Sequence, residues 1–172
     1  MKLHLGCANV NIPGFINVDL DNFPHVHIRA DVRSLPMFSD NSADLIYASA
    51  LFQYFDYHEG IVALKEWSRV LKPGGILRIS TIDFDKLLEV YQKTGKNIDS
   101  IIGPLYGRME IDAETGEKCL INHKTVYTQE KLKESITAVG FKSIVPYKWQ
   151  ELVHASHDDQ SQAYYPHMEK ES

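Results

Sequence analysis

The segment that decides the fold is residues 3–19, which reads LHLGCANVNIPGFINVD. Two short apolar runs in this segment predict β-strands, the first ending at Gly6 and the second at Asp19. Eight residues, 7–14, separate the two strands, and Pro13 stands among them. Because a full parallel crossover takes at least about 10–12 residues, we expect a shortened first crossover made of an irregular loop or a single turn.

Short apolar segments alternate with turns and helical patterns along the rest of the chain. This alternation is typical of an α/β fold with a doubly wound, mostly parallel sheet that is covered by helices. The last candidate strand contains Pro146, which lacks a backbone N–H and therefore suits a sheet edge or a bulge. We expect strands over residues 3–5, 15–18, 27–30, 43–49 and 75–81, with a sixth candidate over 141–149.

Three helices are expected between and after these strands. The first has apolar residues at spacings of three and four, and Pro73 forbids its continuation. Asp83 and Thr128 are suited to cap the two later helices, and a glycine follows the end of each. The expected helices span residues 58–71, 84–93 and 129–139.

The length of the chain, 172 residues, fits one domain. We assign residues 1–153 to a single domain and the polar residues 154–172 to a loosely ordered tail. Residues 103–126 contain several glycines without a sustained period. Long segments of this kind often cover a functional site, so we expect residues 103–126 to be a lid-like excursion.

Composition and charge argue against several classes of protein. The net charge of −5 argues against a nucleic-acid-binding protein, and no apolar run approaches the ~20 residues that span a bilayer. The chain begins directly with a strand-like segment, so we expect no signal peptide. Cys7 and Cys119 form neither a disulfide framework nor a zinc motif. We therefore expect a cytoplasmic protein; the sequence does not indicate its oligomeric state.

Small and acidic residues stand at the ends of four successive strands. The carboxyl ends of parallel strands border the ligand crevice of an open α/β sheet. A glycine after the first strand allows a ligand to approach the backbone, and carboxylates after the next two can accept ribose hydroxyls and the amine of adenine. The ordered set predicts an adenosine pocket. Its members are Gly6, Cys7, Ala8, Asp19, Asp31 and Ser49.

These segments resemble the class I S-adenosylmethionine-dependent methyltransferases, and look closest to a short, type 11-like branch of small enzymes. The resemblance covers residues 2–90 well and residues 120–145 weakly. It implies a Rossmann-like methyltransferase sheet, with S-adenosyl-L-methionine as the cofactor and S-adenosyl-L-homocysteine as the product. The matching stretches are residues 3–19, ADVRSLP at 30–36, ADLIY at 43–47 and EWSRVLKPGGILRI at 66–79.

The resemblance also implies a role for individual residues. The loop after the first strand would pass beneath the methionine and ribose, Asp19 would bind the ribose hydroxyls, and Asp31 with the Val32 amide would hold adenine. Ala8 stands where relatives usually carry a second glycine, and its small methyl group is tolerated there if φ is negative. The implied cofactor-binding residues are Leu5, Gly6, Cys7, Ala8, Asp19, Asp31, Val32 and Ser49.

The reaction that follows is methyl transfer from a sulfonium to an acceptor lone pair. The protein contributes by positioning the acceptor and excluding water, and an oxygen or nitrogen acceptor also needs a general base. Tyr54, Asp83 and His123 are the candidates for such a role, because they lie near the ends of the fourth and fifth strands or in the excursion. The expected acceptor is a small-molecule, saccharide or lipid-linked compound.

Two alternatives to an active enzyme stay open. Ala8 and the absence of an acceptor motif also permit a degenerate methyltransferase-fold domain that binds or supports a partner. A nucleotide-dependent oxidoreductase is disfavoured because Asp19 follows the glycine loop earlier than the ~20 residues of a dinucleotide fingerprint. We expect no metal site: His25 and His27 have no third ligand, and the cluster of His154, His157, Asp158 and Asp159 lies in the polar tail.

Overall fold

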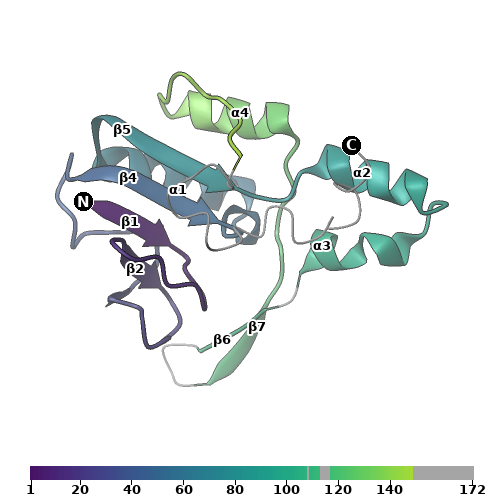
Figure 1. The fold of residues 1–172 in the computed structure, drawn as a ribbon, viewed down its shortest axis with the longest axis horizontal. Helices are drawn as coiled ribbons and strands as arrows, with labels where there is room; N and C mark the ends of the chain where they lie inside the picture. Colours follow the sequence, from purple (N-terminus) through teal and green to yellow (C-terminus); the bar gives the residue numbers. More distant parts are fainter. Residues whose placement is uncertain (108, 113–116, 149–172) are drawn as a thin grey trace.

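The fold is built on a parallel five-stranded sheet with the strand order β3-β2-β1-β4-β5 (Figure 1). A computed structural model describes residues 1–107, 109–112 and 117–148. Every pair of neighbouring strands is parallel, so the expected doubly wound α/β fold is confirmed. The strands are β1 (Lys2–Leu5), β2 (Ile16–Asp19), β3 (Ile28–Arg29), β4 (Ala43–Ser49) and β5 (Leu71–Ser80).

The short first crossover is confirmed, since the residues between β1 and β2 form turns and no helix. They are not loosely attached, because Ile12 is buried and packs with Phe15, Leu45 and Tyr47 on one face of the sheet. The three expected helices are present with ends shifted by at most one residue. They are α1 (Tyr57–Val70), α2 (Phe84–Lys93) and α4 (Gln129–Ala138).

Helix α1 supplies much of the main core and also positions the loop after β3. Leu64 and Trp67 on its inner face are fully buried, and the indole Nε1 of Trp67 donates to the carbonyl of Val32 over 2.9 Å. A capping box at its start joins Asp56 and Glu59, each side chain accepting the other residue's backbone N–H. Helix α4 covers the sheet beside β5 (Figure 1).

The described residues between α2 and α4 contain regular structure, which the sequence did not indicate. A 3₁₀ turn (Ile98–Ser100) and α3 (Ile102–Tyr106) pack with α2 around a small second core. The hairpin of β6 (Met109–Asp112) and β7 (Lys118–Ile121) follows, with antiparallel pairing. In Figure 1 this hairpin lies beyond the carboxyl ends of the sheet strands.

The sixth strand prediction is wrong over its described residues, and other strands have different bounds, with β3 spanning Ile28–Arg29 and not residues 27–30. Residues 141–148 form no strand, since Ser143 has a left-handed φ of 55° and Pro146 has no N–H to donate; residue 149 lies outside the described residues. Strand β5 begins at Leu71 rather than residue 75, because Leu71 already pairs with Ala43, and residues 72–75 bulge before pairing resumes at Ile76. No helix among the described residues has the length and apolar character needed to cross a membrane.

Replacing Leu64 by alanine tests the packing of α1. Leu64 is fully buried, whereas Val62 on the same helix is 40% exposed. We expect Leu64→Ala to lower the free energy of unfolding by about 2–5 kcal/mol, because it leaves a cavity in the main core. Val62→Ala is the matched control and should change it by no more than about 0.5 kcal/mol. Denaturant titration measures both; equal effects would contradict the assigned core.

Candidate functional site

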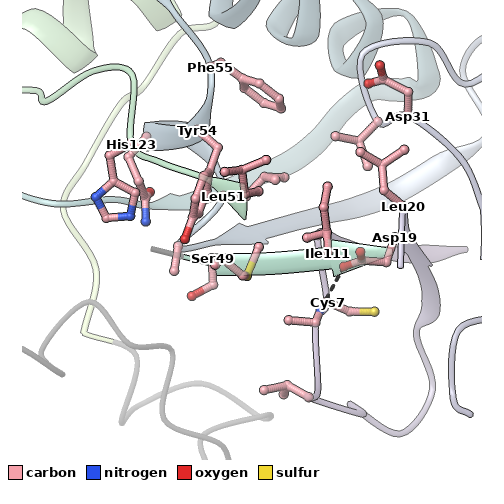
Figure 2. Close-up of a pocket in the computed structure, with 18 of the residues that line it drawn as sticks. Cys7, Asp19, Leu20, Asp31, Ser49, Leu51, Tyr54, Phe55, Ile111 and His123 are labelled. Atoms are coloured by element: carbon pink, nitrogen blue, oxygen red, sulfur yellow. Dashed lines mark hydrogen bonds between the residues drawn. The ribbon is translucent and has the colours of Figure 1, made fainter. Parts of the chain in front are cut away.

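A cavity of about 580 Å³ opens at the carboxyl ends of the strands. Its walls come from the loops after β1, β2, β3 and β4, and from the β6–β7 hairpin that faces them. Figure 2 shows Asp19 and Asp31 on one side of this cavity and Tyr54 and His123 on the other. Seven of the eight expected cofactor-binding residues line it: Gly6, Cys7, Ala8, Asp19, Asp31, Val32 and Ser49. Leu5 does not, because its side chain is fully buried in the core.

The loop after β1 has a left-handed backbone at two positions. Gly6 has a φ of 64°, and a Cβ at this position would lie 2.7 Å from a methyl carbon of Leu51. Ala8 has a φ of 42°, so the condition of a negative φ for an alanine at this position is not met. Its strained backbone is held on both sides, because its N–H donates to Asp19 over 2.8 Å and its carbonyl accepts from His25 Nε2 at 2.9 Å.

His25 is therefore a site-supporting residue that the sequence reading missed. Its side chain fixes the loop, and His27 accepts the N–H of Asn17 through Nδ1. Both histidines are engaged in the framework, and the described residues contain no cluster of three metal-ligating side chains. The second candidate cluster, at His154, His157, Asp158 and Asp159, lies outside the described residues.

Asp19 is almost fully buried and faces the cavity from the end of β2. One carboxylate oxygen accepts the Ala8 N–H and the other accepts the Asp21 N–H at 2.9 Å. A carboxylate offers about four acceptor positions, so two remain for ligand hydroxyls. Asp19 can thus hold the loop and bind a ribose at the same time.

Asp31 has a different environment, because the Arg33 side chain donates three hydrogen bonds to its carboxylate. The guanidinium donates to both carboxylate oxygens at 2.6–3.0 Å, and the Arg33 backbone N–H donates at 2.9 Å. Burial by itself would raise the pKa of Asp31, but the hydrogen bonds and charge of Arg33 lower it below its ordinary value. Asp31 is therefore ionised, and a ligand amine has to share it with Arg33.

Two small residues complete this side of the cavity. Burial, assisted by the charge of Asp19, raises the pKa of Cys7 to about 12, so the thiol stays neutral and acts as a small loop residue. Ser49 ends β4 and accepts a hydrogen bond from Ser80 at 2.8 Å. This contact joins the ends of β4 and β5 at the floor of the cavity.

His123 lies on the opposite wall and is 9% exposed. Its Nδ1 donates to the carbonyl of Pro104 at 2.8 Å, so the neutral ring has an acceptor at Nε2. Tyr54 packs edge-to-face against the ring, with 4.7 Å between centroids. Gly107 must be glycine, because its φ is 51° and a Cβ would lie 2.3 Å from Nε2 of His123.

Asp83, the third catalytic candidate, does not line the cavity. Its carboxylate accepts the backbone N–H groups of Asp85 and Lys86 at the start of α2 and a hydrogen bond from Gln129. These contacts give Asp83 a structural role as the cap of α2, as the sequence predicts.

The hairpin contributes an apolar surface that the sequence reading did not find. Its strands are four residues each, and although Met109–Asp112 alternates apolar and polar residues, Lys118–Ile121 does not, so the pair gives only a weak strand pattern. Four side chains from it line the cavity: Met109, Ile111, Leu120 and Ile121. Asn122, His123 and Lys124 continue this wall, so the 103–126 excursion forms one side of the cavity.

Comparisons with known proteins agree with this geometry. A sequence model described as a methyltransferase domain matches residues 8–79, which include the loop after β1, Asp19, Asp31 and Ser49. Residues 8–79 of the chain therefore match a methyltransferase domain. Solved structures that share the fold are described as SAM-dependent methyltransferases, which agrees with the cofactor that the sequence predicts.

Relatives and solved structures resemble this methyltransferase domain along most of its length. The demethylmenaquinone methyltransferase of Staphylococcus haemolyticus is 30% identical over 128 residues, which are 73% of this chain and 50% of that protein. A Methanosarcina mazei SAM-dependent methyltransferase has a TM-score of 0.53 at 22% identity, covering 80% of this chain and 77% of that one. One from Clostridium acetobutylicum has a TM-score of 0.50 at 16% identity, covering 80% and 71%.

These solved structures share the fold. The chain spans about half the length of the demethylmenaquinone methyltransferases that it matches.

The buried imidazole of His123 predicts a loss of stability in acid. Burial lowers its pKa below the ordinary value, although the hydrogen bond to Pro104 acts in the other direction. Below about pH 6.5 the unfolded chain binds a proton at His123 that the folded chain does not, so stability falls as the pH decreases. Chemical denaturation between pH 8 and 5 should show that the free energy of unfolding falls less for His123→Gln than for the wild type.

At pH 8, His123 is neutral in both the folded and the unfolded state. The difference in the free energy of unfolding between the two proteins at this pH gives the pH-independent effect of the substitution. Parallel curves for the two proteins would contradict a neutral buried His123.

Proposed function

We propose that this chain transfers the methyl group of S-adenosylmethionine to a small-molecule acceptor inside the cavity. The observation that carries this proposal is the meeting of Gly6, Asp19, Asp31 and Ser49 around one cavity that the hairpin covers. We further propose that the protein works in the cytoplasm, where thiols such as those of Cys7 and Cys119 stay reduced.

The cofactor would lie on the side of Asp19 and Asp31. Gly6 presents backbone without a side chain, and Asp19 has two acceptor positions for the ribose hydroxyls. Asp31 and the Val32 amide would hold adenine, with Arg33 sharing and orienting the carboxylate. Cys7 and Ala8 would form the loop surface, Ser49 would lie next to the reacting end, and Leu5 would contribute backbone only.

The acceptor would lie on the side of Tyr54 and His123. The four apolar hairpin side chains favour an acceptor with an apolar ring or chain, and the Staphylococcus relatives are named for a quinone substrate. Saccharide and lipid-linked acceptors remain within the same proposal, since Asn122 and Lys124 add polar groups to this wall.

The bound cofactor supplies an activated methyl group on a sulfonium. The protein's part is to hold the acceptor in line and to exclude water, and the covering hairpin serves both purposes. His123 is neutral and has its Nε2 as an acceptor, so it can orient an acceptor hydroxyl and take its proton. Tyr54 would keep the imidazole in this orientation through its ring contact.

A binding domain without catalysis is the second candidate. Two observations favour it: the left-handed φ at Ala8, a position where a glycine would carry no strain, and the occupation of Asp31 by Arg33. A folded protein that does not bind S-adenosylhomocysteine at millimolar concentration would support this alternative and refute the enzyme.

Removal of the Asp19 carboxylate tests the cofactor side. We expect calorimetry to show S-adenosylhomocysteine binding to the wild type, and Asp19→Ala to weaken it roughly tenfold or more. Hydrogen bonds to a charged group contribute about 1.5–3 kcal/mol, and about 1.4 kcal/mol corresponds to a tenfold change. Asp85→Ala, on exposed α2 surface, is the control for loss of the same charge and should leave the dissociation constant unchanged.

A thermal melt of Asp19→Ala has to show a cooperative transition for the comparison to hold. An unchanged dissociation constant in a folded Asp19→Ala protein would leave Asp19 as a loop-holding residue only.

Removal of the His123 imidazole tests the acceptor side. We expect His123→Ala to keep the affinity for S-adenosylhomocysteine and to lose about 100-fold or more in turnover, the usual contribution of a general base. Turnover is measured as S-adenosylhomocysteine release with a panel of hydroxyl-bearing aromatic acceptors, including demethylmenaquinol. The exposed His58 on α1 provides the control variant His58→Ala. Full turnover in His123→Ala would remove His123 from the mechanism.

A further inference from the structure

Four charged side chains form a continuous network of ion pairs between the two sides of the cavity. Arg33 binds Asp31 at 2.6 Å and reaches Glu59 at 2.5 Å with its other terminal nitrogen. Lys124 binds the same Glu59, with its Nζ at 2.7 and 3.0 Å from the two carboxylate oxygens. The charges alternate in sign along this network, so Arg33 and Glu59 each contact two side chains of opposite charge.

The members come from three separate parts of the fold. Asp31 and Arg33 lie in the loop after β3, on the side expected to hold adenine. Glu59 lies in the first turn of α1, and Lys124 directly follows His123 at the end of the hairpin segment. These ion pairs therefore join the segment that follows the hairpin to the loop after β3 by way of α1.

Glu59 is the fixed point of this arrangement. Its carboxylate also accepts the backbone N–H of Asp56 in the capping box, which holds the side chain against the helix start. The hydrogen bond from Lys124 lowers the pKa of Glu59 against the opposing effect of burial, so the carboxylate stays ionised. Its side chain is 21% exposed, compared with 50% for Lys124.

We infer that Glu59 is a positioning residue that couples closure of the hairpin to the adenine side of the cavity. It holds Lys124, and with it the end of the segment that carries His123, while it also holds Arg33 against Asp31. Glu59 itself does not line the cavity, so it acts through its two cationic partners. This inference rests on the proposed function for its effect on cofactor affinity, but not for its effect on the hairpin.

The test compares four variants with the wild-type full chain. Glu59→Gln removes the charge and keeps the capping box, which accepts glutamine at this position. Lys124→Met removes the cation and keeps an apolar stem, and Lys124→Arg restores the cation. Lys131→Met removes a lysine of similar exposure, 52% compared with 50% for Lys124, from an ion pair on α4 and is the control.

Two measurements are made on each protein. The first is hydrogen exchange of residues 118–125 without ligand, and the second is the dissociation constant of S-adenosylhomocysteine at low and high salt. We expect faster exchange in Glu59→Gln and Lys124→Met, and a dissociation constant for Lys124→Met about two- to fivefold higher at low salt. Glu59→Gln should have the larger effect. Lys124→Arg and Lys131→Met should match the wild type, and the differences should shrink at high salt.

The outcomes separate this inference from the proposed function. If the wild type binds S-adenosylhomocysteine while Glu59→Gln and Lys124→Met match it in exchange and affinity, the positioning role is refuted and the proposed function stands. Affinity losses that are equal at low and high salt also refute it, since an ionic coupling has to be screened. If the wild type does not bind but both variants exchange faster, Glu59 still positions the hairpin and the proposed function fails.

Discussion

The site depends first on the hydrogen bond that Ala8 donates to the Asp19 carboxylate. This bond ties the loop after β1 to the end of β2, and it helps to stabilise a left-handed alanine whose strain is of the order of 1–3 kcal/mol. The loop and the carboxylate therefore face the same cavity, and two acceptor positions of Asp19 remain for a ligand. It acts together with the Asp21 N–H, which also orients the Asp19 carboxylate, and with the Gly6 N–H, which donates to the carbonyl of Val18.

The opposite wall depends on a single short turn after β4. The carbonyl of Gln53 accepts the backbone N–H groups of Lys124 and Thr125, and the Thr125 hydroxyl donates to the carbonyl of Phe55. The same turn presents Tyr54 to His123. The segment that returns from the hairpin is therefore attached directly beside the cavity, which explains how a wall made of two short strands can hold a buried histidine in place.

The parts of the fold that could be predicted are those with local causes. Strand β4 and helix α2 were found with their observed bounds, because an apolar run and the Asp83 cap specify them within a few residues. Residues 141–148 show the limit of this reasoning, since an apolar pattern predicts a strand but cannot supply a partner strand to pair with. The hairpin was missed for the opposite reason. Each of its two strands finds a pairing partner in the other, although the sequence pattern of the two segments does not predict strands.

The sequence by itself determined which residues end the first four strands, and hence that Gly6, Asp19, Asp31 and Ser49 meet at one edge, because parallel strands bring their carboxyl ends together. Only the tertiary structure decided the conformation of Ala8, the contact of Arg33 with Glu59 and the joining of Lys124 to Glu59. Lys124 and Glu59 are 65 residues apart in the chain. Their contact is set by the packing of the hairpin segment against α1, and no local pattern in the sequence encodes it.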